Sequence, residues 1–285
     1  MENKLPKVFV VILNFNGIKV LNNCLACVFN SDYSNLEIIV VDNASTDESL
    51  TQARLKYSRA TFIKNSHNIG FSKGNNIGIR YALEKFADYV FILNNDTLIE
   101  KNTISQLVKT AEKEEAIVSP LILERDASKI WFAGGKINWK EVKTTHVTNQ
   151  ESSTPYASEY LSGCAMIISK DVFKKIGLFD ERFFLYYEDA DFSLRAKNAR
   201  FKLVVDPSIK IVHLEQSNTE NTAKNYWLVL SGLIFFSTHA KGIKKLWFLL
   251  HLRLRKMKNF YAIHFLKNQS AKHIHQAYLD FKKVK

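Results

Sequence analysis

The chain has 285 residues, of which 46% are hydrophobic, 12% aromatic and 24% charged, with only 10 Gly and 4 Pro. This composition excludes a disordered, collagen-like or low-complexity protein, and the length fits one large domain or one domain with an appendage. The net charge of +12 is uneven, because residues 224–285 hold 13 of the 40 Lys and Arg but only one of the 28 acids. We therefore expect a neutral domain at residues 1–223 and a basic extension at residues 224–285.

Residues 8–123 alternate between short apolar runs and helical patterns. The apolar runs at 8–13, 36–41, 60–63 and 89–93 are typical of strands that are buried on both faces. Helical spacing follows them at 17–30, 47–57, 72–86 and 103–115. This alternation predicts an α/β fold with a mostly parallel sheet and right-handed crossovers.

The second half of the body departs from this regular order. Residues 130–158 contain Gly134-Gly135 and a long polar stretch, which we interpret as a hairpin or a mobile loop. Further strands are expected at 160–169, 202–205 and 210–212, and helices at 171–176 and 188–199.

Polar side chains follow three of the predicted strands at the point where each strand ends. They are Asn14, the run Asp42 to Asp47, and Asn94-Asn95-Asp96. Because ligands of open α/β sheets bind at the carboxyl ends of the strands, these residues predict a site for a polar, charged ligand. The alternative is that each cluster only begins a turn or caps a helix. Neither G-x-G-x-x-G after the first strand nor a P-loop occurs, which disfavours a dehydrogenase or a P-loop NTPase.

Five motifs, in this order, resemble the family-2 glycosyltransferases of the GT-A fold, and the last two resemble their rhamnosyltransferase-like branch. They are VVDNASTD at 40–47, NSHNIGFSKGNN at 65–76, LNND at 93–96, LSGCAM at 161–166 and GLFDERFFLYYED at 177–189. The resemblance covers about residues 7–215. It implies a GT-A-like sheet flanked by helices, with the basic helical extension outside it.

The resemblance also implies that the polar edge binds a nucleotide-diphosphate sugar. Asp42 would contact the nucleotide base, where a carboxylate can accept an imide N–H, and Asn14 would assist it. The other expected donor contacts are Asn68, Asn75, Asn94 and Asn95. For the loop that carries Asn68 and Asn75, a simple helix cap is an equal alternative.

A divalent metal is the expected cofactor, with Asp96 as its carboxylate ligand by resemblance. Most members of the family carry D-x-D where this chain has Asn94-Asn95-Asp96. One carboxylate with water and diphosphate oxygens suits Mg²⁺. His213 matches a position where relatives supply a histidine to the metal, and an imidazole would favour Mn²⁺. The expected ion is therefore Mn²⁺ or Mg²⁺, and the alternative for His213 is an inert histidine at a strand end.

Asp189 aligns with the catalytic base of inverting members, which takes the proton from the acceptor hydroxyl. The alternative is that Glu188, Asp189 and Asp191 form an acidic helix start that the helix dipole stabilises.

The basic extension alternates apolar and cationic stretches. Residues 226–240 are uncharged but too short, and too interrupted by polar residues, to span a bilayer. The cations that follow favour helices on an anionic membrane surface. Core helices under the sheet and a homodimer interface are the alternatives, and no motif supports a nucleic-acid partner.

These observations predict an inverting hexosyltransferase that moves a sugar from a nucleotide-diphosphate donor to a lipid-linked or growing surface glycan. The rhamnosyltransferase-like branch suggests dTDP-L-rhamnose, with UDP- and GDP-sugars as alternatives. Three cysteines are too few for a disulfide framework, and residues 1–7 lack the apolar segment of a signal peptide. We therefore expect a cytoplasmic protein, peripheral to the inner face of the cell membrane. A non-catalytic nucleotide-sugar-binding scaffold at the membrane is the alternative from a different class.

Overall fold

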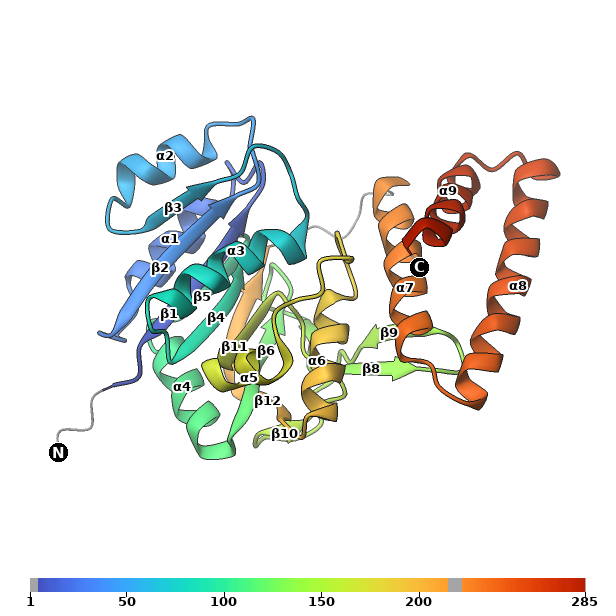
Figure 1. Ribbon diagram of the computed structural model, residues 1–285. Helices are drawn as coiled ribbons and strands as arrows, with labels where there is room; N and C mark the ends of the chain where they lie inside the picture. Colours follow the sequence, from blue (N-terminus) through green and yellow to red (C-terminus); the bar gives the residue numbers. More distant parts are fainter. Residues whose placement is uncertain (1–4, 215–221, 285) are drawn as a thin grey trace.

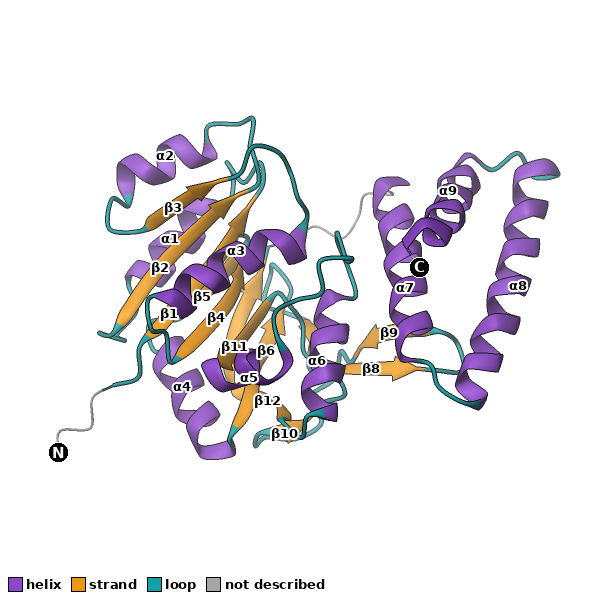
Figure 2. Ribbon diagram, in the orientation of Figure 1, coloured by secondary structure: helices purple, strands orange, loops and turns teal. Residues whose placement is uncertain are grey.

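The computed structural model describes residues 5–214 and 222–284, so parts of both predicted domains, at 1–4, 215–221 and 285, lie outside the described residues. The predicted α/β fold is confirmed, with one large mixed sheet, helices on both of its faces, and a group of three C-terminal helices beside it (Figures 1 and 2). The strands are β1 (Val8–Asn14), β2 (Leu36–Asp42), β3 (Thr61–Lys64), β4 (Tyr89–Asn94), β5 (Thr97–Ile99), β6 (Ala116–Leu123), β7 (Ile130–Phe132), β8 (Gly135–Asn138), β9 (Lys143–His146), β10 (Tyr156–Ala157), β11 (Ala165–Ser169) and β12 (Lys202–His213). The helices are α1 (Leu21–Phe29), α2 (Ser49–Lys56), α3 (Phe71–Glu84), α4 (Thr103–Glu114), α5 (Lys170–Ile176), α6 (Glu188–Asn198), α7 (Thr222–His239), α8 (Ile243–His264) and α9 (Gln269–Val284).

The sheet brings the ends of β1, β2 and β4 to one edge. Its strand order is β10-β12-β6-β11-β4-β1-β2-β3, and β1 pairs in parallel with both β2 and β4. The chain leaves β1 toward β2 and β3 on one side and returns to β4 on the other. In register, Asn14 lies opposite Asp42, and Leu13 lies opposite Asn94. This reversal of strand order creates the crevice in which open α/β sheets bind ligands.

Helix α3 approaches the sheet closely because of two glycines. A Cβ atom added at Gly74 would collide with Leu13, and one added at Gly78 would collide with Val11. Helices α3 and α6 lie in front of the sheet in Figure 1, and α1 lies behind it.

Two strand predictions need correction. The strand expected at 160–169 begins only at Ala165, because side chains replace sheet partners before that point. The N–H of Leu161 donates to Ser193 Oγ (3.0 Å), and the N–H of Gly163 donates to Asp189 Oδ2 (3.0 Å). The strands expected at 202–205 and 210–212 are one strand, β12, whose pairing with β6 shifts register in between.

The three C-terminal helices differ in their burial. The second half of α7 joins the core of the α/β domain through Leu230, Leu233, Ile234, Phe235 and Phe236. This half of α7 is thus a core helix, but it packs against Trp139 and Tyr187 rather than under the sheet. Helix α8 instead leaves most of its large apolar residues exposed, and the β8–β9 hairpin reaches toward these helices (Figure 1). Within the described ranges, no helix has the length and apolarity needed to cross a bilayer.

Candidate active site

Asn14 and Asp42 form a buried hydrogen-bond network at the polar edge of the sheet. Both side chains are 0% exposed. Asn14 Nδ2 donates to Asp42 Oδ1 (2.8 Å), Ser45 Oγ (3.1 Å) and Ser49 Oγ (2.9 Å). Asn14 Oδ1 accepts a hydrogen bond from Asn95 Nδ2 (2.8 Å). One amide thus ties together the loops that follow β1, β2 and β4.

The carboxylate of Asp42 is directed into this network. It also accepts the N–H of Ser45 at Oδ2 (3.0 Å) and the hydroxyl of Ser45 at Oδ1 (2.6 Å). Its contact with a nucleotide base stays a prediction. Sequence reasoning did not assign a role to Ser45, Asp47 or Ser49; Asp47 accepts the N–H groups of Ile18 (2.9 Å) and Ser49 (3.1 Å).

Asn68 and Asn75 lie at the start of α3. Asn68 Oδ1 accepts the N–H of Gly70 (3.0 Å) and a bond from Asn43 Nδ2 (3.3 Å), which is the geometry of a loop that leads into a helix. Asn75 is buried, and its Nδ2 donates to Phe71 O (3.1 Å). Among the described residues, the buried atoms Asn75 Oδ1 and Ser72 Oγ have no hydrogen-bond partner.

Asp96 and His213 lie together although 117 positions separate them in the sequence. The pairing of β5 with β12 sets His213 opposite Thr97, so Asp96 Oδ1 lies 3.2 Å from His213 Nε2. Asp96 Oδ1 is buried, and the two atoms are not aligned as a hydrogen bond. Burial alone would lower the pKa of His213, but Cys164 and Asp96 raise this pKa to about 11.

This pair fits a divalent metal as a set of two ligands. Once His213 is neutral, one carboxylate oxygen and one imidazole nitrogen can face the same cation, which suits Mn²⁺. Within the part of the chain that the structure describes, no group of three His, Cys, Asp or Glu is arranged to hold a metal. Further ligands would therefore be oxygens of water or of a diphosphate.

Asp189 lines a pocket of about 360 Å³ together with Asn94 and His213. Its Oδ2 accepts the N–H of Gly163 (3.0 Å), and its Oδ1 accepts the N–H of Ala190 (2.7 Å). Burial raises the pKa of Asp189, although these two N–H groups and the nearby charge of His146 lower it in part. The carboxylate is therefore fixed in position and holds a proton more readily than an exposed aspartate.

The segment before Asp189 is strained. Tyr186 and Tyr187 have φ angles of +68° and +67°, in the left-handed region that residues with a Cβ seldom adopt. Helix α7 supports this segment, since Ser231 Oγ donates to Leu185 O (2.7 Å) and the Cα of Gly232 faces the ring of Tyr187.

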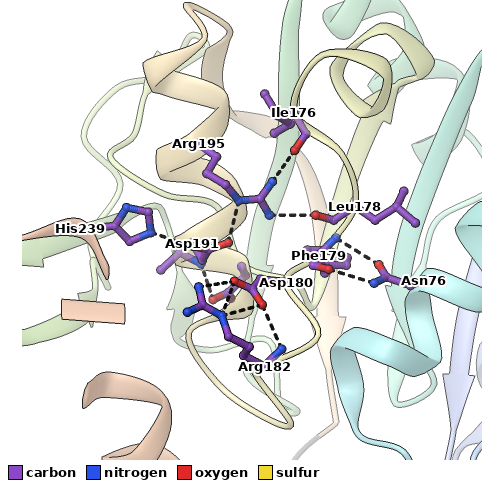
Figure 3. A network of polar contacts seen from close by, with 11 residues as sticks. Asn76, Ile176, Leu178, Phe179, Asp180, Arg182, Asp191, Arg195 and His239 are labelled. Atoms are coloured by element: carbon purple, nitrogen blue, oxygen red, sulfur yellow. Dashed lines mark hydrogen bonds and ion pairs between the residues drawn. The ribbon is translucent and has the colours of Figure 1, made fainter. Parts of the chain in front are cut away.

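The three acids at the start of α6 have different surroundings. Glu188 is buried, which raises its pKa well above the ordinary value. Asp191 is 1% exposed and binds Arg195 Nε (2.8 Å) and His239 Nε2 (2.7 Å), so it joins α6 to the end of α7 (Figure 3). Glu188 lines the same pocket as Asp189, but its Oε2 has no hydrogen-bond partner among the described residues. Asp189 alone of the three accepts two backbone N–H groups and also lines the pocket with His213 and Asn94.

Sequence reasoning missed several walls of this pocket. They are Trp131, Thr144, His146 and Tyr160, which come from β7, from β9 and from the segment before β11. The polar stretch at 144–146 predicted a hairpin or loop at this point of the chain. It did not indicate that the hairpin lines the pocket of Asp189. Lys224 and Leu228 of α7 also line the pocket.

The fold and this polar edge define the class of GT-A glycosyltransferases. The chain belongs to Glycosyl transferase family 2, whose sequence profile matches residues 9–177. It is similar to the dTDP-rhamnosyl transferase RfbF of Shigella flexneri, with 32% identity over 208 residues that cover 72% of this chain and 68% of the relative. It is also similar to the N-acetylglucosaminyl-diphospho-decaprenol L-rhamnosyltransferase of Mycobacterium tuberculosis, with 25% identity over 77% of this chain and 78% of the relative.

Solved structures agree with the fold. GalNAc-T7, solved with UDP, GalNAc and Mn²⁺, superimposes with a TM-score of 0.65 at 18% identity over 81% of this chain and 48% of its own. A mannosyltransferase from Pyrobaculum calidifontis, solved with GDP-Man and Mn²⁺, gives a TM-score of 0.62 at 14% identity over 98% of this chain and 88% of its own. The predicted family, GT-A fold and hexosyltransferase activity are thus confirmed, which disfavours the non-catalytic scaffold.

Proposed function

We propose that this transferase is an inverting, metal-assisted enzyme that moves L-rhamnose from dTDP-L-rhamnose to a lipid-linked or growing surface glycan. The observation that carries the proposal is the shared pocket of Asp189, His213 and Asn94 at the carboxyl edge of the sheet. The name of the Shigella relative supports the donor, and the name of the mycobacterial relative supports a lipid-linked acceptor.

In this proposal Asp189 is the general base. Each of its oxygens accepts one backbone N–H, which leaves a further lone pair for the proton of the acceptor hydroxyl. Its raised pKa brings it closer to neutral pH, where a base combines proton affinity with a sufficient ionised fraction. Asp96 and His213 would hold Mn²⁺ or Mg²⁺, which when bound offsets negative charge on the leaving diphosphate.

The donor-binding residues follow the edge of the sheet. Asn94 lines the pocket, and Asn75 on α3 has a buried oxygen, Oδ1, without a hydrogen-bond partner among the described residues. Asn95 and Asn68 hold the loops that frame the donor. Asp42, assisted by Asn14, remains the proposed contact of the nucleotide base.

We also propose that the protein is cytoplasmic and that α8 lies on the inner face of the membrane. The exposed side chains of α8 include Leu246, Leu250, Met257 and Phe260, among many cations. A helix that combines exposed apolar residues with Lys and Arg binds anionic lipid surfaces.

Thermal unfolding with dTDP, UDP and GDP, each with and without Mn²⁺, tests the donor and the metal. A ligand that binds only the folded state raises Tm by mass action. We expect the largest rise with dTDP and Mn²⁺ together, and the loss of its metal-dependent part in Asp96→Asn. A larger rise with UDP or GDP would assign the donor to that nucleotide instead. A rise that does not depend on the metal would contradict the role of Asp96.

A further inference from the structure

A second groove adjoins the Asp189 pocket. It lies among α7, α8, α9 and the β8–β9 hairpin and has a volume of about 610 Å³, larger than the pocket itself. Thr144, Tyr187 and Leu228 line both the groove and the pocket. The groove and the pocket of Asp189 are therefore direct neighbours.

The groove is cationic. Its lining holds Lys143, Arg255 and Lys258 and no Asp or Glu. Lys143 is paired with Glu141, whereas Arg255 and Lys258 form no ion pair with any residue in the described ranges. Unpaired cations beside a groove attract an anion, and the guanidinium of Arg255 matches the geometry of a phosphate group.

Asn259 adds a donor without a partner. Its side chain is only 7% exposed and lines the groove, and its Nδ2 finds no acceptor among the described residues. Buried polar groups normally have partners, so the amide of Asn259 has a hydrogen bond to donate to a group that enters the groove. Arg255, Lys258, Asn259 and Ala262 follow one another at helical spacing on a single side of α8.

The opposite wall of the groove is apolar. Leu228, Val229 and Leu233 of α7 and Ile274 of α9 face the cations of α8. An amphiphile with an anionic head and an apolar chain matches both walls, whereas a free sugar or a nucleotide matches only one.

We propose that this groove binds the phosphate and the adjoining apolar units of a polyprenyl-phosphate-linked acceptor. Arg255, Lys258 and Asn259 hold the phosphate, and the glycan extends past Tyr187 into the pocket of Asp189. The proposal rests on the proposed function, because it takes the Asp189 pocket as the place of transfer. The exposed side chains of Met257 and Phe260 are the chain neighbours of Lys258 and Asn259, where the lipid chain would pass into the membrane.

Binding of farnesyl diphosphate by the full-length protein, measured by isothermal titration below its critical micelle concentration, tests the groove. The double variant Arg255→Gln, Lys258→Gln is expected to bind at least about tenfold more weakly, because two charge-assisted contacts are lost. The matched control, Lys245→Gln with Arg253→Gln, removes the same charge from exposed positions of the same helix outside the groove. The control is expected to stay within about twofold of the wild type. Equal weakening in both variants would overturn the proposal.

Asn259→Leu separates ligand binding from stability. The side chain has a similar size, and no hydrogen bond of Nδ2 is lost in the free protein. We expect Tm to rise by about 2 °C, since a buried unpaired donor disappears, and binding of farnesyl diphosphate to weaken several-fold. Unchanged binding, or a Tm that falls, would contradict the assignment of this amide.

Two further ligands distinguish the source of the anion. Farnesol, which lacks the anion, and inorganic pyrophosphate, which lacks the chain, are each expected to bind at least about tenfold more weakly than farnesyl diphosphate. Phosphatidylglycerol vesicles are the third ligand. If they bind as tightly as farnesyl diphosphate, and if Arg255→Gln with Lys258→Gln weakens their binding equally, the groove is assigned to the membrane surface instead. The Tm rise with dTDP and Mn²⁺ does not involve the groove, so its presence or absence reports separately on the proposed function.

Discussion

Asp189 combines two properties that a single side chain seldom has. Two backbone N–H groups, of Gly163 and Ala190, fix its carboxylate, yet burial keeps its pKa above that of an ordinary aspartate. The neighbouring imidazole of His146 lowers the pKa of Asp189, because its positive charge favours the ionised carboxylate. A residue of the β9 strand, far away in the sequence, thus contributes to the pH at which the proposed base ionises, although burial has the larger effect on its pKa.

His146→Gln should shift the acidic limb of the pH profile of kcat/KM. A base acts only when ionised, so activity falls as the pH drops through its pKa. Without the charge of His146 the pKa of Asp189 rises, and the limb moves to higher pH. The control Thr145→Ala changes a neighbour in β9 that does not line the pocket. A limb that stays in place, or moves to lower pH, would contradict this coupling.

Among the elements, α6 and α7 act as one unit. Asp191 is buried between Arg195 of its own helix and His239 at the end of α7, and Arg195 also donates to the carbonyls of Ile176 and Leu178 (Figure 3). The helix that carries Asp189 is therefore fixed from both sides. The stacked rings of Phe184 and Trp227, with centroids 4.2 Å apart, add a further contact to α7.

His239→Ala is expected to lower the free energy of unfolding by about 1–3 kcal/mol. The buried carboxylate of Asp191 loses one of its two partners, and a hydrogen bond to a charged group contributes that amount. Chemical denaturation provides the measurement, and His273→Ala, at an exposed position of α9, provides the control. Equal stability of the two variants would show that the contact between Asp191 and His239 contributes nothing.

The elements also show what a sequence reveals and what it hides. The apolar runs before Asn14, Asp42 and Asn94 are typical of buried parallel strands. The polar edge at which these strands end could therefore be predicted. The left-handed backbone of Tyr186 and Tyr187 could not, because neither residue favours it and the packing of α7 maintains it. The position of the β8–β9 hairpin near Asp189 depends on contacts between distant parts of the chain. The hydrophobic periodicity of the sequence predicts local structure and not such contacts.

At the scale of the whole molecule, the helices of the basic extension differ in burial, so two of the alternatives that the sequence left open can apply to different helices. Helix α7 is apolar and buried, whereas α8 is apolar and exposed, and only tertiary packing distinguishes them. Figure 1 shows α7, α8 and α9 together on one side of the α/β domain, and residues 224–285 hold 13 Lys and Arg but one acid. An anionic membrane, a lipid-linked acceptor and the active site would thus meet at one end of the protein.

Liposome flotation tests the membrane role of α8. Leu246 and Met257 are both 68% exposed and lie on the same face of α8. We expect Leu246→Ser with Met257→Ser to reduce binding to anionic vesicles about tenfold or more, since each apolar side chain contributes about 1.5–3 kcal/mol when buried in lipid. Leu55→Ser with Phe86→Ser, at exposed sites of the α/β domain outside the basic extension, is the control. An equal loss of vesicle binding in both double variants would argue against α8 as the membrane-binding surface. Binding that does not depend on anionic lipid would argue against it as well.

The central claim is that Asp189 is the base of an inverting sugar transfer, and the turnover of the nucleotide sugar by Asp189→Asn tests it most directly. The assay measures nucleotide diphosphate released from dTDP-L-rhamnose in the presence of Mn²⁺, and the same preparations are titrated with dTDP. Loss of a general base lowers the rate by about 10²–10⁴-fold. We expect a loss of this size with dTDP affinity unchanged within about twofold. Wild-type turnover by Asp189→Asn would contradict the mechanism.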